Sequence, residues 1–137
     1  MSDKVEFELV SPERLLVSES VEMVVLPGAE GDFGVLPGHA ATVSSIRPGL
    51  LAVYDNGAVT SRIFVSGGFA EVTPERCTLL ADSAVPLDEM NRADIEKSIS
   101  DLKDDIVAAR DDAEREAAEK ALTIAQAKIA VLDNAIY

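Results

Sequence analysis

Cysteine, histidine and aromatic residues are scarce in this sequence, which contains one Cys, one His and no Trp in 137 residues. A single cysteine, Cys77, excludes an internal disulfide and suits a reducing compartment. One cysteine and one histidine cannot fill the tetrahedral shell of a zinc site, so we expect no metal and no cofactor. Cys77 stands in an apolar run typical of a buried strand, which favours a core cysteine over a nucleophile.

Basic residues are also few, because 12 Lys and Arg face 25 Asp and Glu, and the net charge is −13. This balance excludes nucleic-acid binding, which needs clusters of basic side chains. It also opposes direct adhesion to an anionic membrane surface. No apolar run reaches the length of about 18 residues that a spanning helix needs. The start, "MSDKVEFELV", lacks the layout of a signal peptide. We therefore expect a membrane link only through another protein.

Glycine and proline are absent from the last part of the chain. All eight glycines and all six prolines lie between Pro12 and Pro86. Because both residues favour turns and disfavour helix interiors, this distribution separates a turn-rich part from a helical part. We therefore predict two domains, one over residues 1–86 and one over residues 87–137.

The first domain has the pattern of short strands. In "VEFELV" the apolar residues Val5, Phe7 and Leu9 alternate with glutamates, as in a half-buried strand. "DNG" at residues 55–57 predicts a tight hairpin, because Asn and Gly tolerate positive φ. About eight to ten strands with frequent turns indicate a β-sandwich or flattened barrel.

The second domain has the pattern of two helices. Apolar residues spaced alternately by four and three positions form one stripe on each helix. The stripes consist of Ile95, Ile99, Leu102, Ile106 and Ala109, and of Ala118, Leu122, Ala125, Ile129, Leu132 and Ile136. A break is predicted near Arg110, with Asp111 as the N-cap of the second helix and Glu114 completing a capping box. The expected arrangement is an antiparallel helical hairpin.

The most distinctive stretch is "LPGAEGDFGVLPGHA", residues 26–40. It is rich in glycine, but it lacks the lysine of a phosphate-binding P-loop. Together with "PGLLAV" and "VSGGFAEV" further along, with "FELVSPERLL" before it and with "TLLADSAV", it closely resembles the epsilon subunit of the F-type ATP synthase. The resemblance spans nearly the whole chain and is weakest after Leu87. A β-sandwich followed by a helical hairpin is also the architecture of that family.

The resemblance implies a non-catalytic subunit of the rotor. Such a subunit joins the gamma subunit of the central stalk to the membrane ring of c subunits, and it acts indirectly on the alpha and beta subunits of the catalytic head. A peripheral location on the cytoplasmic face of a bacterial inner membrane is implied as well. The same family includes members whose helical tail inhibits ATP hydrolysis.

The resemblance also implies contact residues. The c ring would be met by the loop that contains Glu30, Gly31 and Asp32, with Asp32 as the acid at the tip. The gamma subunit would be met by Ser11, His39 and Ser44. One exposed ion pair contributes only about 0–1 kcal/mol, so cohesion with gamma is expected mainly from apolar and backbone contacts.

The tail departs from the family pattern. Members that bind ATP between the helices have an aspartate separated by two residues from Arg-Ala, whereas "LDEMNRA" here puts three residues between Asp88 and Arg92. In a continuous helix the extra residue rotates Arg92 by about 100°. We therefore do not expect Asp88 and Arg92 to bind nucleotide as the motif does. In members of the family that inhibit hydrolysis, the tail presses basic residues against acidic loops of the catalytic subunits. The second helix here is mainly acidic, so we expect weak or no inhibition of hydrolysis.

Two other classes of protein remain open at this point. An acidic β-sandwich adaptor with a coiled-coil tail would explain the architecture, but not the specific stretch at residues 26–40. A small hydrolase that uses His39 with Cys77 or a serine would need a nucleophile motif, and none is present. Co-purification with gamma and the c ring would distinguish the rotor subunit from the adaptor, and substitution of His39 would test the hydrolase.

Overall fold

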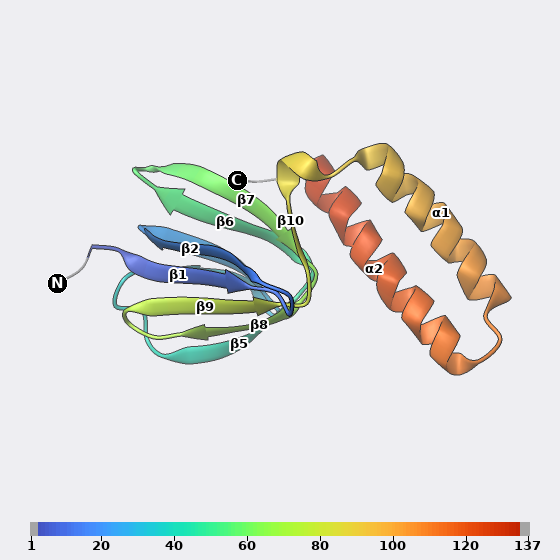
Figure 1. Ribbon diagram of the computed structural model, residues 1–137, viewed down its shortest axis with the longest axis horizontal. Coiled ribbons are helices and arrows are strands. Elements are labelled where there is room, and N and C mark those ends of the chain that lie inside the picture. Colours follow the sequence, from blue (N-terminus) through green and yellow to red (C-terminus); the bar gives the residue numbers. More distant parts are fainter. Residues whose placement is uncertain (1–2, 135–137) are drawn as a thin grey trace. The chain divides into compact units, whose positions relative to one another are not determined.

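The computed structural model describes residues 3–134. The chain forms two compact units that meet in the sequence between Leu87 and Asp88 (Figure 1). The first unit consists of strands and the second of helices. None of the described helices is long and apolar enough to span a membrane.

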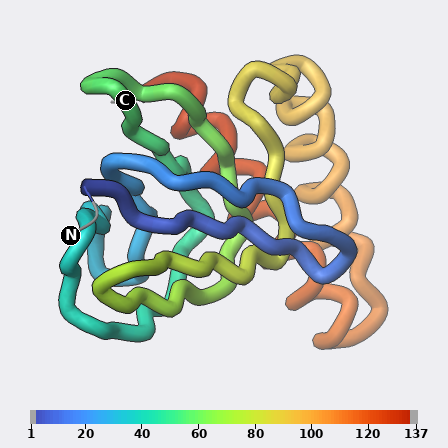
Figure 2. Tube along the Cα trace, turned by 60° about the vertical axis from the view of Figure 1, so that its left-hand side comes forward, coloured from blue at the N-terminus to red at the C-terminus, as the bar shows by residue number. Residues whose placement is uncertain are grey.

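The first unit contains a single curled sheet (Figures 1 and 2). One of its strands, β4, is paired only with β3. Its strands within residues 3–134 are β1 (Val5–Val10), β2 (Leu15–Val21), β3 (Met23–Gly28), β4 (Gly31–Val35), β5 (Thr42–Ile46), β6 (Gly49–Asp55), β7 (Ala58–Val65), β8 (Gly68–Val72), β9 (Arg76–Ala81) and β10 (Ala84–Pro86). They are arranged in the order β10-β7-β6-β3-β5-β8-β9-β1-β2. The pairing of β1 with β9 is parallel, and the other pairs are antiparallel. The predicted fold class is confirmed.

The core lies inside the curled sheet and follows the alternation seen in the sequence. Val5, Phe7 and Leu9 of β1 are fully buried, while Glu6 points to solvent. Cys77 of β9 stands opposite Phe7 and is also fully buried. The prediction that Cys77 is a core residue is therefore confirmed. Burial raises the pKa of its thiol to about 12 because the thiolate would lose its hydration.

The hairpin predicted at residues 55–57 is confirmed. Asp55 pairs with Ala58, and the two residues between them, Asn56 and Gly57, have φ angles of 53° and 76°. Two consecutive residues with positive φ define the type I′ turn, whose twist matches that of the flanking strands. The carboxylate of Glu22 accepts a hydrogen bond of 2.9 Å from the Gly57 amide.

The second glycine of the "VSGG" stretch, Gly68, is required for steric reasons. Gly68, the first residue of β8, has a φ of +128°, and a Cβ atom there would lie 2.0 Å from the carbonyl oxygen of Leu80. Only glycine allows β9 to approach so closely. Beside it, the hydroxyl of the buried Ser66 forms a 2.7 Å hydrogen bond with the hydroxyl of Ser83.

The second unit is a helical hairpin. After a short 3₁₀ turn, η1 (Leu87–Glu89), the helices α1 (Arg92–Ala108) and α2 (Asp112–Asn134) pack against each other. The break predicted near Arg110 is confirmed. Asp111 caps α2, because its Oδ1 accepts a 2.8 Å hydrogen bond from the Glu114 amide. The Glu114 carboxylate accepts a 2.9 Å bond from the Arg110 amide, so the capping box closes one residue earlier than its usual form.

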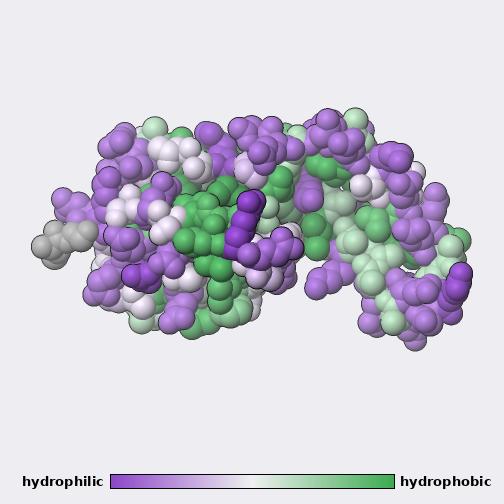
Figure 3. Space-filling model, viewed as in Figure 1, coloured by the Kyte–Doolittle hydropathy of each residue, from purple (hydrophilic) through white to green (hydrophobic). Residues whose placement is uncertain are grey.

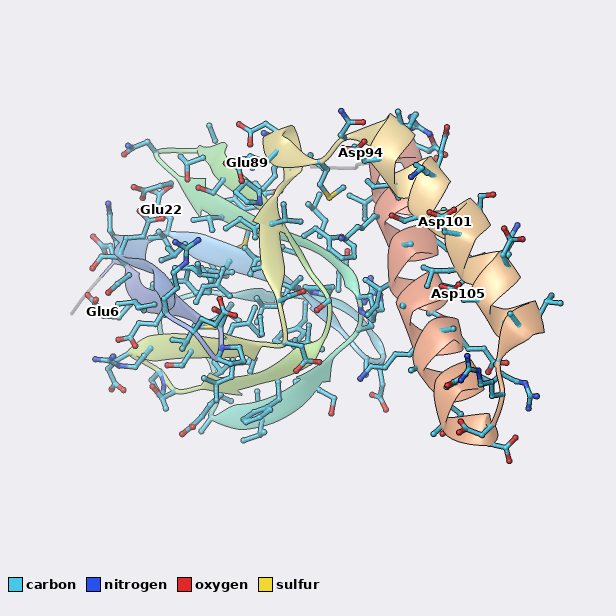
Figure 4. The ribbon with its side chains drawn as sticks, turned by 45° about the vertical axis from the view of Figure 1, so that its right-hand side comes forward. Glu6, Glu22, Glu89, Asp94, Asp101 and Asp105 are labelled. Carbon is cyan, nitrogen blue, oxygen red and sulfur yellow. The ribbon has the colours of Figure 1, made fainter. Side chains whose placement is uncertain are left out.

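The two predicted stripes form the seam of this hairpin. Ile95, Ala118 and Ala125 are buried, and the other seam residues up to Leu132 are half-buried. Ile136 lies outside the described residues. The small alanines of α2 leave room for the isoleucines of α1, which allows the two helices to pack closely. Charged residues of α1 are exposed, among them Asp94, Asp101 and Asp105 (Figure 4).

Candidate functional site

The loop singled out in the sequence is the turn between β3 and β4. Gly28 pairs with Gly31, so Ala29 and Glu30 form the tip, and both are exposed. Gly31 has a φ of +142°, which favours glycine at the end of this turn. Asp32 is not at the tip, contrary to expectation, because it belongs to β4 and pairs with Pro27.

Asp32 is instead bound by an arginine from another strand connection. Arg47, just after β5, forms an ion pair with the Asp32 carboxylate through Nη2. Its Nη1 donates a 2.5 Å hydrogen bond to the carbonyl oxygen of Gly28. One guanidinium therefore contacts both sides of the β3–β4 hairpin. The Arg47 side chain is 42% exposed and that of Asp32 is 29% exposed, so the pair lies at the surface.

Backbone contacts hold the same two segments together. The amide of Ala29 donates to the carbonyl of Ser45 at 2.8 Å, and the amide of Arg47 donates to the carbonyl of Pro27 at 2.9 Å. A Cβ atom on Gly28 would lie 2.7 Å from the carbonyl oxygen of Gly31 and 2.9 Å from the Phe33 ring, which explains the glycine. The tip of the loop is thus carried by closely packed backbone rather than by a flexible segment.

The strand register shows which candidate residues lie at the same end of the sheet. Ser11 follows Val10, which pairs with Leu80 at the end of β9. The pairings Gly68–Ala81, Ile46–Gly68 and Gly28–Ile46 continue along this end to the Ala29–Glu30 tip. His39 lies at the opposite end, since it precedes β5, whose first residue Thr42 pairs with the last residue of β8. Ser11 and the loop therefore share one end, and His39 does not.

His39 has the contacts of a loop residue. Its Nδ1 lies 2.7 Å from the carbonyl oxygen of Ala40, its ring centroid is 6.5 Å from that of Phe33, and its amide donates to Leu36 at 3.1 Å. Burial raises the pKa of the Cys77 thiol to about 12, so this thiol stays protonated at neutral pH. Cys77 therefore cannot act as a nucleophile with His39 as its base. Among residues 3–134, no group of three or more His, Cys, Asp or Glu side chains could hold a metal ion.

Ser44 lies inside β5, opposite Ala70, and it is half-buried. Its hydroxyl donates a 3.1 Å hydrogen bond to the carbonyl of Ser45. Because Ala70 is a core residue, Ser44 belongs to the inward face of β5, and its neighbours Val43 and Ser45 belong to the outward face.

Sequence reasoning missed an apolar row on the outer face of the sheet. Successive cross-strand pairs join Phe69 to Leu80, Leu80 to Val10 and Val10 to Leu15. Phe69, Leu80 and Leu15 are 47%, 40% and 56% exposed. Figure 3 shows hydrophobic residues gathered on the face of this unit among mostly hydrophilic ones. The row could not be predicted from the sequence because it crosses four strands, and its members are far apart in the chain.

In the helical hairpin, Asp88 and Arg92 do not share a helix. Asp88 lies in the η1 turn, whereas Arg92 is the first residue of α1 after the N-cap Asn91, so the expected rotation of about 100° does not apply. The Arg92 guanidinium forms an ion pair with Asp133 of α2 and lies 3.6 Å from Glu96. These carboxylates, Asp133 first, raise the pKa of Arg92 above its ordinary value.

A hollow between the helices lies near their connection, at the end away from Arg92. It is lined by Leu102, Asp105, Ala108, Arg110, Glu114, Ala117, Ala118 and Ala121. Two carboxylates and one guanidinium give this lining a net negative charge. Such a lining is unfavourable for the phosphates of a nucleotide.

Two family models match successive parts of the chain. Residues 4–87 match the β-sandwich domain of the ATP synthase delta/epsilon chain, and residues 91–136 match the C-terminal domain of the ATP synthase epsilon chain. The curled sheet and the hairpin therefore define a chain of the ATP synthase delta/epsilon class.

Relatives that match nearly the whole chain identify the family within this class. The ATP synthase epsilon chain of Rhodospirillum centenum is 56% identical over 134 residues, which cover 94% of this chain and 92% of the relative. That of Rhodospirillum rubrum is 49% identical over 130 residues, which cover 95% and 97%. This protein belongs to the ATP synthase epsilon chain family, whose members are non-catalytic subunits of the enzyme complex.

Solved structures agree with this assignment. A chain in the mitochondrial ATP synthase of Euglena gracilis, described as its OSCP/F1/c-ring part, aligns with a TM-score of 0.82 and 29% identity over 96% of this chain and 83% of that one. A chain in the central stalk and c ring of the Tetrahymena thermophila enzyme has a TM-score of 0.62 at 12% identity, covering 93% and 96% of the two chains, and shows the fold alone.

Proposed function

We propose that this chain is the epsilon subunit of a bacterial F-type ATP synthase and connects the gamma subunit of the central stalk to the c ring. It would thereby act indirectly on the alpha and beta subunits of the catalytic head. The observation that carries the proposal is the match of both family models to successive parts of the chain. The bacterial relatives support a peripheral position on the cytoplasmic face of the inner membrane, reached through the c ring.

The c-ring contact is assigned to the β3–β4 turn, with Glu30, Gly31 and Asp32. Its support is geometric, since Ala29 and Glu30 are exposed at one end of the sheet on a tip fixed by backbone bonds. A torque-transmitting contact needs such a rigid support, because a loose loop would absorb displacement. Within residues 3–134 the Glu30 carboxylate has no ion pair, so it is available to a donor on a partner.

The gamma contact is assigned to the outer surface of the sheet, with Ser11 and His39 as candidate residues. Ser44, the third residue implied by the resemblance, lies on the inward face of β5 and has less support. The apolar row of Phe69, Leu80, Val10 and Leu15 supports this assignment, because partly exposed apolar side chains in register are typical of an interface core. Ser11 follows Val10 of that row and lies at the same end of the sheet as the β3–β4 turn. His39 lies at the opposite end of the sheet, so a partner that touches both residues would extend along the whole unit.

Nucleotide binding by Asp88 and Arg92 has little support. The Arg92 guanidinium is already paired with Asp133 and lies near Glu96, and phosphates would have to displace these carboxylates. We therefore expect ATP to leave the hairpin unchanged.

The central experiment is co-purification of the tagged chain from solubilised membranes. The rotor assignment requires gamma in near-equal yield with the tagged chain, together with the several c subunits of the ring, whereas an adaptor of another complex would bring different proteins. Leu80→Asp should reduce the recovery of gamma, and Asp32→Arg should weaken proton-coupled ATP synthesis in vesicles while the purified chain stays folded. Recovery of neither gamma nor c subunits would refute the proposal.

A further inference from the structure

Arg47 is placed to control the shape of the β3–β4 tip. It stands on the connection after β5, outside the glycine-rich stretch, yet it contacts residues on both sides of the turn. Its Nη2 reaches Asp32 on β4 and its Nη1 reaches the Gly28 carbonyl on β3. A planar guanidinium can donate to two acceptors in fixed directions, which a lysine cannot do.

The backbone of the same connection adds two more bonds to the hairpin. Ala29 donates to Ser45 and Arg47 donates to Pro27. The Arg47 side chain therefore extends a backbone contact that already sets the direction of the turn. Without the side chain, the Gly28 carbonyl and the Asp32 carboxylate would each lose a charged donor, and Gly31 would be free to use the broad range of φ open to glycine.

The pair also changes the role of Asp32. Its carboxylate is bound within the subunit, whereas that of Glu30, two residues earlier, is exposed at the tip and has no ion pair within residues 3–134. An acid that already accepts a charge-assisted bond has less to offer a cationic group on a partner. Glu30 is therefore the carboxylate that the turn presents outward.

We propose that Arg47 is a positioning residue for the partner-facing turn: by binding Asp32 and the Gly28 carbonyl, it holds Glu30 in the orientation that contacts the c ring. Asp32 then acts on the ring through Arg47 rather than by its own charge. This inference rests on the proposed rotor function.

The test uses three substitutions at Arg47, studied first in the purified chain and then in the complete ATP synthase. Arg47→Met removes both bonds and keeps an apolar stem, Arg47→Lys keeps the charge with a single donor group, and Arg47→Ala removes the stem as well. Arg76→Ala is the matched control, because Arg76 forms a similar surface ion pair, with Glu8, on the same sheet. Glu30→Lys and Asp32→Asn test the two acids separately.

The first measurement is amide hydrogen exchange at residues 28–32 in the purified chain. Loss of the two bonds should speed exchange in the turn on the order of tenfold in Arg47→Met, with Arg47→Lys between it and the parent. Arg76→Ala should leave this turn unchanged. Unaltered exchange in Arg47→Met and Arg47→Ala would overturn the positioning role, whatever the function of the protein.

The second measurement is ATP synthesis driven by a fixed proton gradient in membrane vesicles. Synthesis should fall strongly in Glu30→Lys, clearly in Arg47→Met, and less in Arg47→Lys and Asp32→Asn, which retain part of the clamp. If Glu30→Lys impairs synthesis but Arg47→Met does not, the ring contact stands and the positioning role is wrong. If no substitution in the turn affects synthesis, both are wrong, while co-purification with gamma still tests the rotor assignment separately.

Discussion

Arg92, the first residue of α1, forms an ion pair with Asp133 in the last turn of α2 and joins the two helices at the end away from their connection. The same guanidinium lies 3.6 Å from Glu96. The pair favours the folded hairpin, in which the ends of the two helices are adjacent. A hairpin that opened would have to break it.

The Arg92 pair predicts a salt-dependent stability of the hairpin. Arg92→Ala should lower the midpoint of helix unfolding in the full chain at low salt, and the difference should shrink near 1 M salt, where charges are screened beyond about 3 Å. Circular dichroism at a helix-sensitive wavelength measures this. Lys97→Ala is the control, because the Lys97 amine is 3.9 Å from Asp101 of the same helix and forms no ion pair with a second element within the described residues 3–134. ATP should leave the midpoint of the parent protein unchanged, and a rise with ATP that requires Arg92 would contradict our view of the tail.

The burial of Cys77 predicts slow reaction of its thiol and a loss of folding stability at alkaline pH. The pKa of its thiol is raised from an ordinary 9.0 to about 12 by burial, so the unfolded chain releases the proton first as pH rises. The contribution of Cys77 to stability should be complete below pH 9 and should decline between pH 9 and about 12. Alkylation at pH 8 should be slow in the folded chain and fast in urea. Rapid alkylation without denaturant would show that the strand β9 opens locally.

Gly68 predicts a large effect from adding one methyl group. Gly68→Ala combines a φ of +128° with a Cβ atom 2.0 Å from the Leu80 carbonyl oxygen, so the β8–β9 pairing must shift. We expect a loss of stability on the order of 3 kcal/mol, measured by urea unfolding. Gly34→Ala is the matched control, since its Cβ would lie 3.3 Å from the flexible Met23 side chain, which can move. Equal effects of the two substitutions would show that backbone strain at Gly68 is not the cause.

The parts of the structure with local signals could be predicted from the sequence. Alternation in "VEFELV", the turn at Asn56 and Gly57, and the cap at Asp111 each depend on residues close together in the chain. The clamp between Arg47 and Asp32 could not be predicted, because it depends on the pairing of Gly28 with Ile46 across the sheet. For the same reason, the sequence did not reveal that Ser11 and His39 lie at opposite ends, or that Phe69 and Leu15 belong to one apolar row.

The charge of α2 predicts how the catalytic head responds to loss of the tail. The basic residues Arg115, Lys120 and Lys128 are outnumbered by Asp111, Asp112, Glu114, Glu116, Glu119 and Asp133. An extended α2 would be repelled by acidic surfaces, so it should inhibit hydrolysis little. Deletion of residues 88–137 should leave the sheet folded and the complex assembled, with hydrolysis within about twofold of the parent, a change well below about 1 kcal/mol in barrier.

A double substitution in α2 tests whether its acidity is what prevents inhibition of hydrolysis. Glu116→Lys with Glu119→Lys converts part of the exposed surface of α2 from acidic to basic without touching the seam residues Ala118 and Leu122. If acidity alone prevents inhibition, this double variant should slow ATP hydrolysis, and deletion of its tail should restore the rate. If deletion of the parent tail raises hydrolysis about tenfold, the native tail inhibits despite its charge, and apolar contacts rather than ion pairs must carry that inhibition.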